Sequence, residues 1–195
     1  LQSLRDDVEN TFLYSSGEDL SGSNTRYKMK GVKQLIVTNN VTSPTNASAY
    51  KPTDFMRDVI QSVHSKGGNV DLIMLSSKFM LGLGTWGIPL QRLDPGETLF
   101  GVGIQAFSCP FLNDIPMVEN MWLDYAHSSG YAACGFSMDE IRWRVLEELD
   151  YKPYGRNGDI AEAGDWIHRA AIEVDNESHH SWVQGITGFA PRSEE

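Results

Sequence analysis

Apolar and polar residues alternate along the last third of the chain. From Trp166 to Val174, one face of an extended segment would take Trp166, His168, Ala170, Ile172 and Val174, while the residues between them, including Arg169 and Glu173, would take the other. This period of two is typical of a half-buried β-strand. Turn-forming residues occupy 155–159 and 175–178. We therefore expect a tight turn before this strand, and after it a hairpin that returns along residues 179–187.

Residues 138–152 fit either a helix or a strand. Ser137 and Glu140 have the spacing of a helix capping box, and a helix would collect Ile141, Val145 and Leu149 on one face. A helix leaves Trp143 and Tyr151 off that face, whereas an extended strand collects both on one side. That strand face would hold Ile141, Trp143, Val145, Glu147, Leu149 and Tyr151. The pattern favours the strand.

The middle of the chain predicts helices set among strands. Apolar residues at helical spacing predict a helix over 53–66, with Thr53 as its cap and Gly67 and Gly68 at its end. That helix should pack against a short buried strand over 70–75. A short helix over 76–83, a glycine-rich loop around Trp86 and a strand over 98–109 should follow. Upstream, 31–38 reads as a strand, and 15–30 and 39–49 read as polar segments. This order indicates an α+β fold.

The first residues have the pattern of a helix that is already under way. Leu1, Leu4, Val8 and Phe12 fall on one helical face, and no capping residue precedes them. We therefore expect this sequence to be the C-terminal portion of a longer chain, with Leu1 and Leu4 on the least stable turn of the helix.

Composition narrows the possible functions of the 195-residue chain. Its formal net charge of −10 argues against a surface that grips nucleic acid, since phosphate binding depends on lysine and arginine. There are only two cysteines, Cys109 and Cys134, so a disulfide framework is not expected. No apolar run is long enough to cross a membrane.

Several groups of residues could carry chemistry, and each has a simpler structural explanation. His168, Asp175, Glu177, His179 and His180 could be metal ligands, yet adjacent histidines in a strand point to opposite faces. Asp159 and Asp165 lack the spacing of a calcium loop. Gly82-x-Gly84-x-x-Gly87 lacks the strand–helix context of a dinucleotide site. The remaining candidates are Ser76, Ser77 and Cys109 as nucleophiles and Asp139, Glu140, Glu147 and Glu148 as an acid/base pair. We expect no catalytic, cofactor-binding or metal-binding residues.

Five tryptophans leave a carbohydrate-binding alternative open. Trp86, Trp122, Trp143, Trp166 and Trp182 could stack on sugar rings, although aromatic residues at alternating strand positions more often belong to a core. A glycan-acting hydrolase or a carbohydrate-binding α+β domain is therefore the alternative function.

The order of segments resembles the C-terminal portion of the major capsid proteins of tailed bacteriophages. The residues that carry this resemblance are Val8-Glu9, the 31–32 strand, Val70-Asp71-Leu72-Ile73, 102–107, Met121-Trp122-Leu123-Asp124, 158–177 and Gly185-Ile186-Thr187-Gly188. The resemblance implies the Hong Kong ninety-seven type of capsid fold, with an axial domain and a peripheral domain that carries a spine helix and a long antiparallel sheet. The N-terminal arm and extended loop of that family have no counterpart in this sequence.

The resemblance also implies a domain division and a function. Residues 1–52 would hold the end of the spine helix, a polar loop and a peripheral strand, 53–135 the axial domain, 136–188 the peripheral sheet and 189–195 a flexible tail. The protein would be a non-enzymatic subunit of an icosahedral phage shell, assembled in the host cytoplasm and located in the virion. Its partners would be copies of itself and possible scaffold, portal or decoration proteins, with no sequence-specific nucleic acid and no membrane.

Overall fold

The computed structural model describes residues 2–17, 29–83, 91–99, 102–109, 112–125, 128–154 and 164–190. Within these ranges, only the backbone is described for 2–5, 91–99, 102–105, 108–109, 112–113 and 165–166. The predicted turn at 155–159 and the predicted loop around Trp86 lie outside the described residues.

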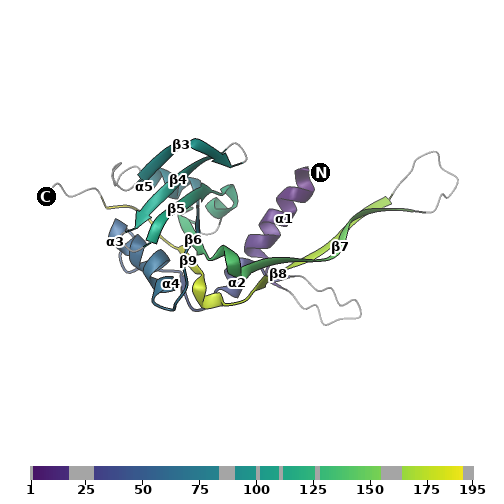
Figure 1. Ribbon diagram of the computed structural model, residues 1–195, viewed down its shortest axis with the longest axis horizontal. Helices are drawn as coiled ribbons and strands as arrows, with labels where there is room; N and C mark the ends of the chain where they lie inside the picture. Colours follow the sequence, from purple (N-terminus) through teal and green to yellow (C-terminus); the bar gives the residue numbers. More distant parts are fainter. Residues whose placement is uncertain are drawn as a thin grey trace.

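A seven-stranded mixed sheet forms the body of the molecule (Figure 1). Its spatial order is β1 (Asn40–Val41), β9 (Ser181–Gln184), β6 (Ala132–Phe136), β2 (Leu72–Leu75), β5 (Leu112–Glu119), β4 (Val102–Cys109) and β3 (Gln91–Leu99). The pairs β1–β9 and β2–β5 are parallel, and the other pairs are antiparallel. The predicted strand at 70–75 is confirmed in β2. The strand predicted over 98–109 is confirmed only in part, as β4, because residues 98 and 99 belong to β3, which pairs antiparallel with β4. The expectation of a loop up to residue 97 is wrong, because β3 occupies part of it.

The sheet is covered on both faces, because neighbouring strand residues belong to different clusters of buried side chains. Ala133 and Val183 lie in one cluster, and their neighbours Cys134 and Trp182 lie in the other. Since successive strand side chains point to opposite faces, the two clusters are the two faces of the sheet. This explains why every described residue of β6 and β9 is buried.

One continuous helical segment covers the first face. It comprises α3 (Pro52–Phe55), a π-helical stretch η1 (Met56–Gln61) and α4 (Ser62–His64), and it lies nearest to β9 and β6. The π-helical hydrogen bonding leaves carbonyl groups to other donors, and the hydroxyl of Ser181 donates to the carbonyl of Val59 at 2.9 Å. Phe55, Val59, Ile60 and Val63 are fully buried. The predicted buried face is therefore confirmed, and β9 and β6 are its main strand neighbours rather than β2.

The ends of this segment follow from local chemistry. Pro52 occupies the first turn, where its missing N–H costs nothing, and the Asp54 carboxylate accepts a hydrogen bond from the Lys51 N–H at 3.3 Å. The prediction of Thr53 as the cap is therefore wrong, because the N-cap residue is Lys51. At the other end Gly67 has φ +88°, and the N–H of Gly68 donates to the carbonyl of Val63 at 3.2 Å. The predicted glycine stop is confirmed. The predicted helix over 76–83 is also confirmed, as α5 (Ser77–Leu83).

The second face is covered by α1 (Gln2–Tyr14), α2 (Val32–Leu35) and the 3₁₀ turn η4 (Met121–Tyr125). The predicted N-terminal helix is confirmed. The predicted strand over 31–38 is wrong, because this segment forms α2. Val32 and Ile36 are both buried, and a spacing of four residues fits one face of a helix as well as one face of a strand. The N–H of Ile36 donates to the carbonyl of Val32 at 3.0 Å, which is the helical bond.

A separate two-stranded antiparallel ribbon extends away from the body (Figure 1). It consists of β7 (Ile141–Pro153) and β8 (Gly164–Val174). The strand predicted over 138–152 is confirmed, and the capping box at Ser137 is not formed, since its side chain makes no cap hydrogen bond. A strand forms within the predicted range 179–187, as β9, but the predicted hairpin with β8 is wrong, because β9 pairs with β1 and β6. After β8 the chain makes a short 3₁₀ turn, η6 (Glu177–His179), and β9 enters the body sheet, where both of its faces are buried.

Candidate assembly surface

The ribbon β7–β8 has one apolar face and one charged face. Directly opposed residues of an antiparallel pair share a face. Cross-strand pairs on the apolar face are Ile141 with Val174, Trp143 with Ile172, Val145 with Ala170, and Tyr151 with Trp166. The face that the alternating pattern predicts for β8 is confirmed by this register. At the base of the ribbon, Ile141 and Ile172 pack against the core of the body.

Two irregularities in β7 change which of its residues are apolar-facing. The register shifts between Val145 and Glu147 and again between Glu147 and Asp150. The first shift sets Glu147 opposite Arg169 on the charged face, so the prediction that Glu147 shares a face with Trp143 and Val145 is wrong. Such bulges cannot be read from a pattern of alternation, because they interrupt it.

Ion pairs run along the charged face. Arg142 Nη2 is 2.9 Å from Asp175 Oδ2, Arg144 pairs with Glu173, and Glu147 contacts both Lys152 and Arg169. The hydrogen bond from Lys152 is the main cause that lowers the pKa of Glu147. Pairs this exposed contribute little stability each. Their main consequence is a surface on which positive and negative charges alternate.

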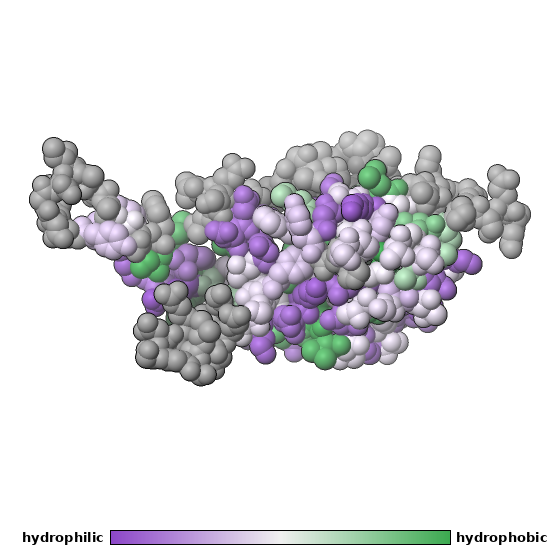
Figure 2. All heavy atoms as spheres, turned by 180° about the vertical axis from the view of Figure 1, so that it is seen from behind, coloured by the Kyte–Doolittle hydropathy of each residue, from purple (hydrophilic) through white to green (hydrophobic). Residues whose placement is uncertain are grey.

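Large hydrophobic side chains on the ribbon stay exposed. The exposed fractions are 84% for Leu146, 47% for Val145 and 41% for Trp143, and Leu149 and Tyr154 are also exposed. Seen from behind, the coloured surface carries mostly hydrophilic and intermediate residues, with hydrophobic ones in small separate patches (Figure 2). The ribbon therefore concentrates exposed apolar area on an element with little of its own core.

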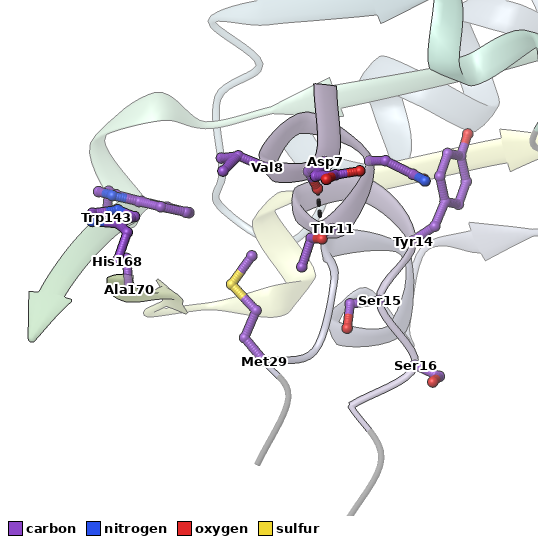
Figure 3. Close-up of a pocket in the computed structure, with 11 residues that line it drawn as sticks. Asp7, Val8, Thr11, Tyr14, Ser15, Ser16, Met29, Trp143, His168 and Ala170 are labelled. Atoms are coloured by element: carbon purple, nitrogen blue, oxygen red, sulfur yellow. Dashed lines mark hydrogen bonds between the residues drawn. The ribbon is translucent and has the colours of Figure 1, made fainter. Parts of the chain in front are cut away.

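A groove of about 600 Å³ lies between the ribbon and α1. Trp143 and His168 face it from the ribbon, opposite Val8 and Thr11 of α1, and Met29 approaches from the connecting segment (Figure 3). The Nδ1 atom of His168 is buried and has no hydrogen-bond partner among the described residues. The ribbon side of the groove therefore continues the apolar face of the ribbon, whereas the α1 side also carries polar residues such as Asp7 and Asn10.

The base of the ribbon is held to the body by polar contacts. The Glu177 carboxylate accepts hydrogen bonds from the N–H groups of Val37 and Thr38, both at 2.9 Å, and from the Thr38 hydroxyl. The Asn39 amide donates to the carbonyls of Ser178 at 2.6 Å and His180 at 3.0 Å. These contacts join residues about 140 positions apart, so no local sequence signal reveals them.

The structure separates the residues that could have formed a metal site. The ring of His168 stacks with that of Trp143 in the ribbon, whereas His180 is fully buried beside Phe136. Glu177 is engaged with Thr38, and Asp175 pairs with Arg142. Across the described part of the chain, no group of three or more histidine, cysteine, aspartate or glutamate residues could hold a metal ion. Asp159, Gly84 and Gly87 lie outside the described residues, as does the side chain of Asp165.

Of the candidate nucleophiles, Ser76 and Ser77 have structural partners, and the side chain of Cys109 lies outside the described residues. The Ser76 hydroxyl accepts from the N–H groups of Phe79 and Ala132 at 3.2 Å each. The Ser77 hydroxyl donates to the Asp124 carboxylate at 2.5 Å. Cys134 is a buried free thiol, and burial raises its pKa. Of the four carboxylates weighed as acid/base groups, Glu140 contacts His179 and Glu147 contacts Lys152.

The described tryptophan side chains do not form one platform. Trp182 is fully buried, Trp122 packs against the second core cluster, and Trp143 lies on the ribbon. The side chains of Trp86 and Trp166 lie outside the described residues. The alternative of a glycan-acting or carbohydrate-binding domain is not supported. Among the described helices, none is long and apolar enough to span a membrane.

Comparisons with known proteins bear out the predicted resemblance. The chain is similar in structure to the holo-SrpI encapsulin complex of Synechococcus elongatus PCC 7942, with a TM-score of 0.62, 11% identity, and coverage of 98% of this chain and 66% of that one. It is also similar to a protein of Mycobacterium phage Ogopogo, with a TM-score of 0.53, 14% identity, and coverage of 93% and 66%. The chain thus spans about two thirds of the length of each. No curated protein sequence matches it.

These likenesses, together with the mixed α+β architecture, confirm the predicted Hong Kong ninety-seven type of capsid fold. A family model described as the SU10 major capsid protein matches residues 1–187, and the chain therefore belongs to the SU10 major capsid protein family.

Proposed function

We propose that this protein is a structural subunit of a bacteriophage capsid, and that it associates with copies of itself through the ribbon β7–β8. Family membership supports the shell role. The single observation that carries the surface is the ribbon itself, a two-stranded element that projects from the body with large hydrophobic side chains exposed.

Physical reasoning supports a covered ribbon in the assembled state. An isolated two-stranded ribbon is marginally stable in water, because it has little core and two unpaired edges. Its base is anchored where Ile141 and Ile172 join the body core. Contact with neighbouring subunits would bury Val145 and Leu146, pair the open edges and match the alternating charges of Arg144 and Glu173 with those of another copy.

The finer expectations from the sequence are part of the same proposal. The division at residues 53 and 136 would set an axial domain between two parts of a peripheral domain, with β1 and β9 contributing strands to the body sheet from either side of it. The subunit would have no enzymatic role and would reside in the virion after assembly in the host cytoplasm. Scaffold, portal or decoration proteins would be further partners.

Self-association is the measurement that tests the proposal. The double substitution Leu146→Ser with Leu149→Ser removes exposed apolar area from the ribbon and leaves the body core intact. Sedimentation velocity, light scattering and negative-stain microscopy over a range of salt concentrations should show weaker association than in the unmodified chain. Leu81→Ser on α5 is the matched control, since Leu81 is also highly exposed but lies on the body. Equal association of the double variant and the unmodified chain would refute the ribbon as the contact surface.

A further inference from the structure

His179 lies where the ribbon joins the body. Its Nδ1 is 2.6 Å from Oε1 of Glu140, which immediately precedes β7. Its Nε2 is 3.1 Å from the carbonyl oxygen of Lys66, just beyond α4, and 3.1 Å from the side-chain nitrogen of Asn176, which follows β8. A single imidazole therefore contacts residues next to both strands at the base of the ribbon, and a residue just beyond the covering helix of the body.

The partners of Nε2 make opposite demands on the ring. A carbonyl oxygen only accepts a hydrogen bond, whereas an amide nitrogen only donates one. The Asn176 amide is oriented by its oxygen, which accepts from the N–H of Ser178 at 3.3 Å and from its hydroxyl at 2.8 Å. With Nδ1 donating to Glu140, a protonated ring donates from Nε2 to Lys66, and a neutral ring accepts at Nε2 from Asn176.

The ring is held in this position by close packing. Gly68 lies against it, since a Cβ at residue 68 would be 2.7 Å from the ring carbon Cγ of His179. The neighbouring pair of Asn39 and Lys66 fixes the body side, because the Lys66 ammonium donates to the Asn39 side-chain oxygen at 2.5 Å. The ring therefore has little room to move with either Lys66 or Asn176 if these two partners separate.

Charged and titratable groups lie on each element that adjoins the ring. They are Glu140 and Asp71 from the segments before β7 and β2, His64 and Lys66 from the covering helix and its end, and Asp175, Glu177 and His180 from the ribbon's exit. Acidic groups outnumber cationic ones, and Glu140 is in direct contact with the ring. Burial lowers the pKa of His180, which favours the neutral form of that ring.

We propose that His179 is a proton-operated latch at the base of the ribbon. Protonated, it bridges Glu140 of the ribbon to the Lys66 carbonyl of the body. When the ring is neutral, Nε2 accepts a hydrogen bond from the Asn176 amide instead. The hydrogen bond to the Lys66 carbonyl is then lost, and the ribbon base becomes more mobile. The latch regulates the ribbon β7–β8, and its biological role rests on the proposed function. Its protonation can be measured in the unassembled chain.

Nitrogen-15 NMR of the histidine side chains, recorded against pH, tests the protonation step. The His179 Nε2 signal should move from a protonated to an unprotonated nitrogen as pH rises, while Nδ1 stays protonated. Hydrogen exchange of the backbone amides near residues 141–145 and 170–174, corrected for the intrinsic pH dependence, tests the mechanical step. Protection there should fall about fivefold across the same pH range, the effect of one hydrogen bond. Amides of β6 and β9 should not change and serve as the internal control.

Two variants separate the latch from a general loss of folding. His179→Gln should remove the pH-dependent change in ribbon protection, and His64→Gln, at the end of α4, should retain it. Asn176→Asp keeps the capping oxygen for Ser178 and replaces the amide donor by an acceptor. It should move the midpoint of the His179 transition upward by about 1 pH unit.

Each outcome bears on one hypothesis alone. Ribbon protection that does not vary with pH in the unmodified chain, or an unshifted midpoint in Asn176→Asp, overturns the latch even where self-association is normal. A working latch in a chain that never associates at any pH overturns the proposed function and leaves the latch standing.

Discussion

The rings of Trp143 and His168 stack against each other on the apolar face of the ribbon, with centroids 6.4 Å apart and planes inclined by 22°. Both line the groove beneath α1, together with Ala170. Trp143 nevertheless keeps 41% of its surface exposed. Its ring therefore has one part fixed by the histidine and another part available to a neighbouring molecule.

Replacing Trp143 should weaken association more than folding. Trp143→Ala removes the stacked pair, which costs about 0.5–1.5 kcal/mol of unfolding free energy. Denaturant melts should show this small loss, and sedimentation should show a larger loss of self-association. Trp143→Phe, which keeps an aromatic ring, is the control and should retain most of the association. Unchanged association of the alanine variant would show that this ring is not part of a contact.

Replacing Ile60 should weaken folding more than association. Its side chain is fully buried between the covering helix and the body sheet. Ile60→Ala should lower the unfolding free energy by about 2–5 kcal/mol, through lost apolar contact and the cavity that remains. Gln61→Ala alters the next, exposed residue and should change stability little. A near-zero effect of Ile60→Ala in a denaturant melt would show that Ile60 does not contribute to the core.

Gly67 and Gly68 should respond differently to alanine, although they are adjacent. At Gly68 a Cβ would lie 2.7 Å from the His179 ring and 2.8 Å from Val63, so overpacking should cost about 1–3 kcal/mol. At Gly67 nothing lies within 4 Å, and only the strain of a residue at φ +88° applies, about 1 kcal/mol. Thermal melts of both variants should rank Gly68→Ala as the more damaging. The reverse order would show that His179 is not packed against Gly68.

Sequence patterns predict best those elements whose apolar residues recur at the period of the helix or strand that forms. The helix from Pro52 and the first part of β7, up to Val145, carry apolar residues at the spacing that their final surroundings require. The segment around Val32 does not, because its spacing of four fits either state, and the close approach of Gly31 to the Leu13 carbonyl belongs to the tertiary structure. β9 was assigned the wrong partner for a similar reason. A strand buried on both faces gives no sign of which strands cover its edges.

The candidate surface was only half visible in the sequence. Alternation revealed the apolar face of β8, but the bulges that turn Glu147 to the charged face are set by pairing and not by composition. At the ribbon base, the His179 latch contacts Glu140 and Lys66, and the Glu177 carboxylate forms a clamp on Thr38. Contacts between residues so far apart in the sequence form only in the folded chain. The sequence therefore indicates that the adjacent His179 and His180 are poor metal ligands, but it does not reveal their actual partners.

The clamp formed by Glu177 should stabilise the protein above acidic pH. Burial alone would raise the pKa of Glu177, but hydrogen bonds from Thr38 and Val37 and the charge of Lys66 outweigh it, so its pKa is lowered. A lowered pKa contributes stability that is complete above the ordinary value of 4.5 and is lost as pH falls below it. Glu177→Gln should cost about 1 kcal/mol at pH 7, discounted for partial exposure.

The pH dependence of that cost is the sharper measurement. Denaturant melts of Glu177→Gln and the unmodified chain should converge between pH 4.5 and the lower folded pKa. Asp139→Asn, on the turn before β7, is a matched loss of one carboxylate and should not show the same convergence. A constant difference down to acid would mean that the charge of Glu177 is not what holds Val37 and Thr38.

His180 should make the protein less stable in mild acid. Its ring is fully buried, its Nδ1 accepts a hydrogen bond from the Ser137 N–H at 3.3 Å, and burial lowers its pKa below the ordinary 6.5. The unfolded chain therefore binds a proton at a pH where the folded chain does not. Its contribution to stability is present above about pH 6.5 and declines as pH falls toward the folded pKa, by at most about 1.4 kcal/mol per pH unit.

His180→Gln isolates this effect, because glutamine does not titrate and keeps an acceptor for Ser137. The variant should be less stable than the unmodified chain at pH 8, since the packing beside Phe136 is disturbed. The difference should then shrink as pH is lowered from 7 to 5, because only the histidine protein loses stability through protonation of its unfolded state. Unfolding free energies measured at several pH values would decide it. Curves that stay parallel over this range would mean that His180 takes up a proton as readily in the folded protein as in the unfolded one.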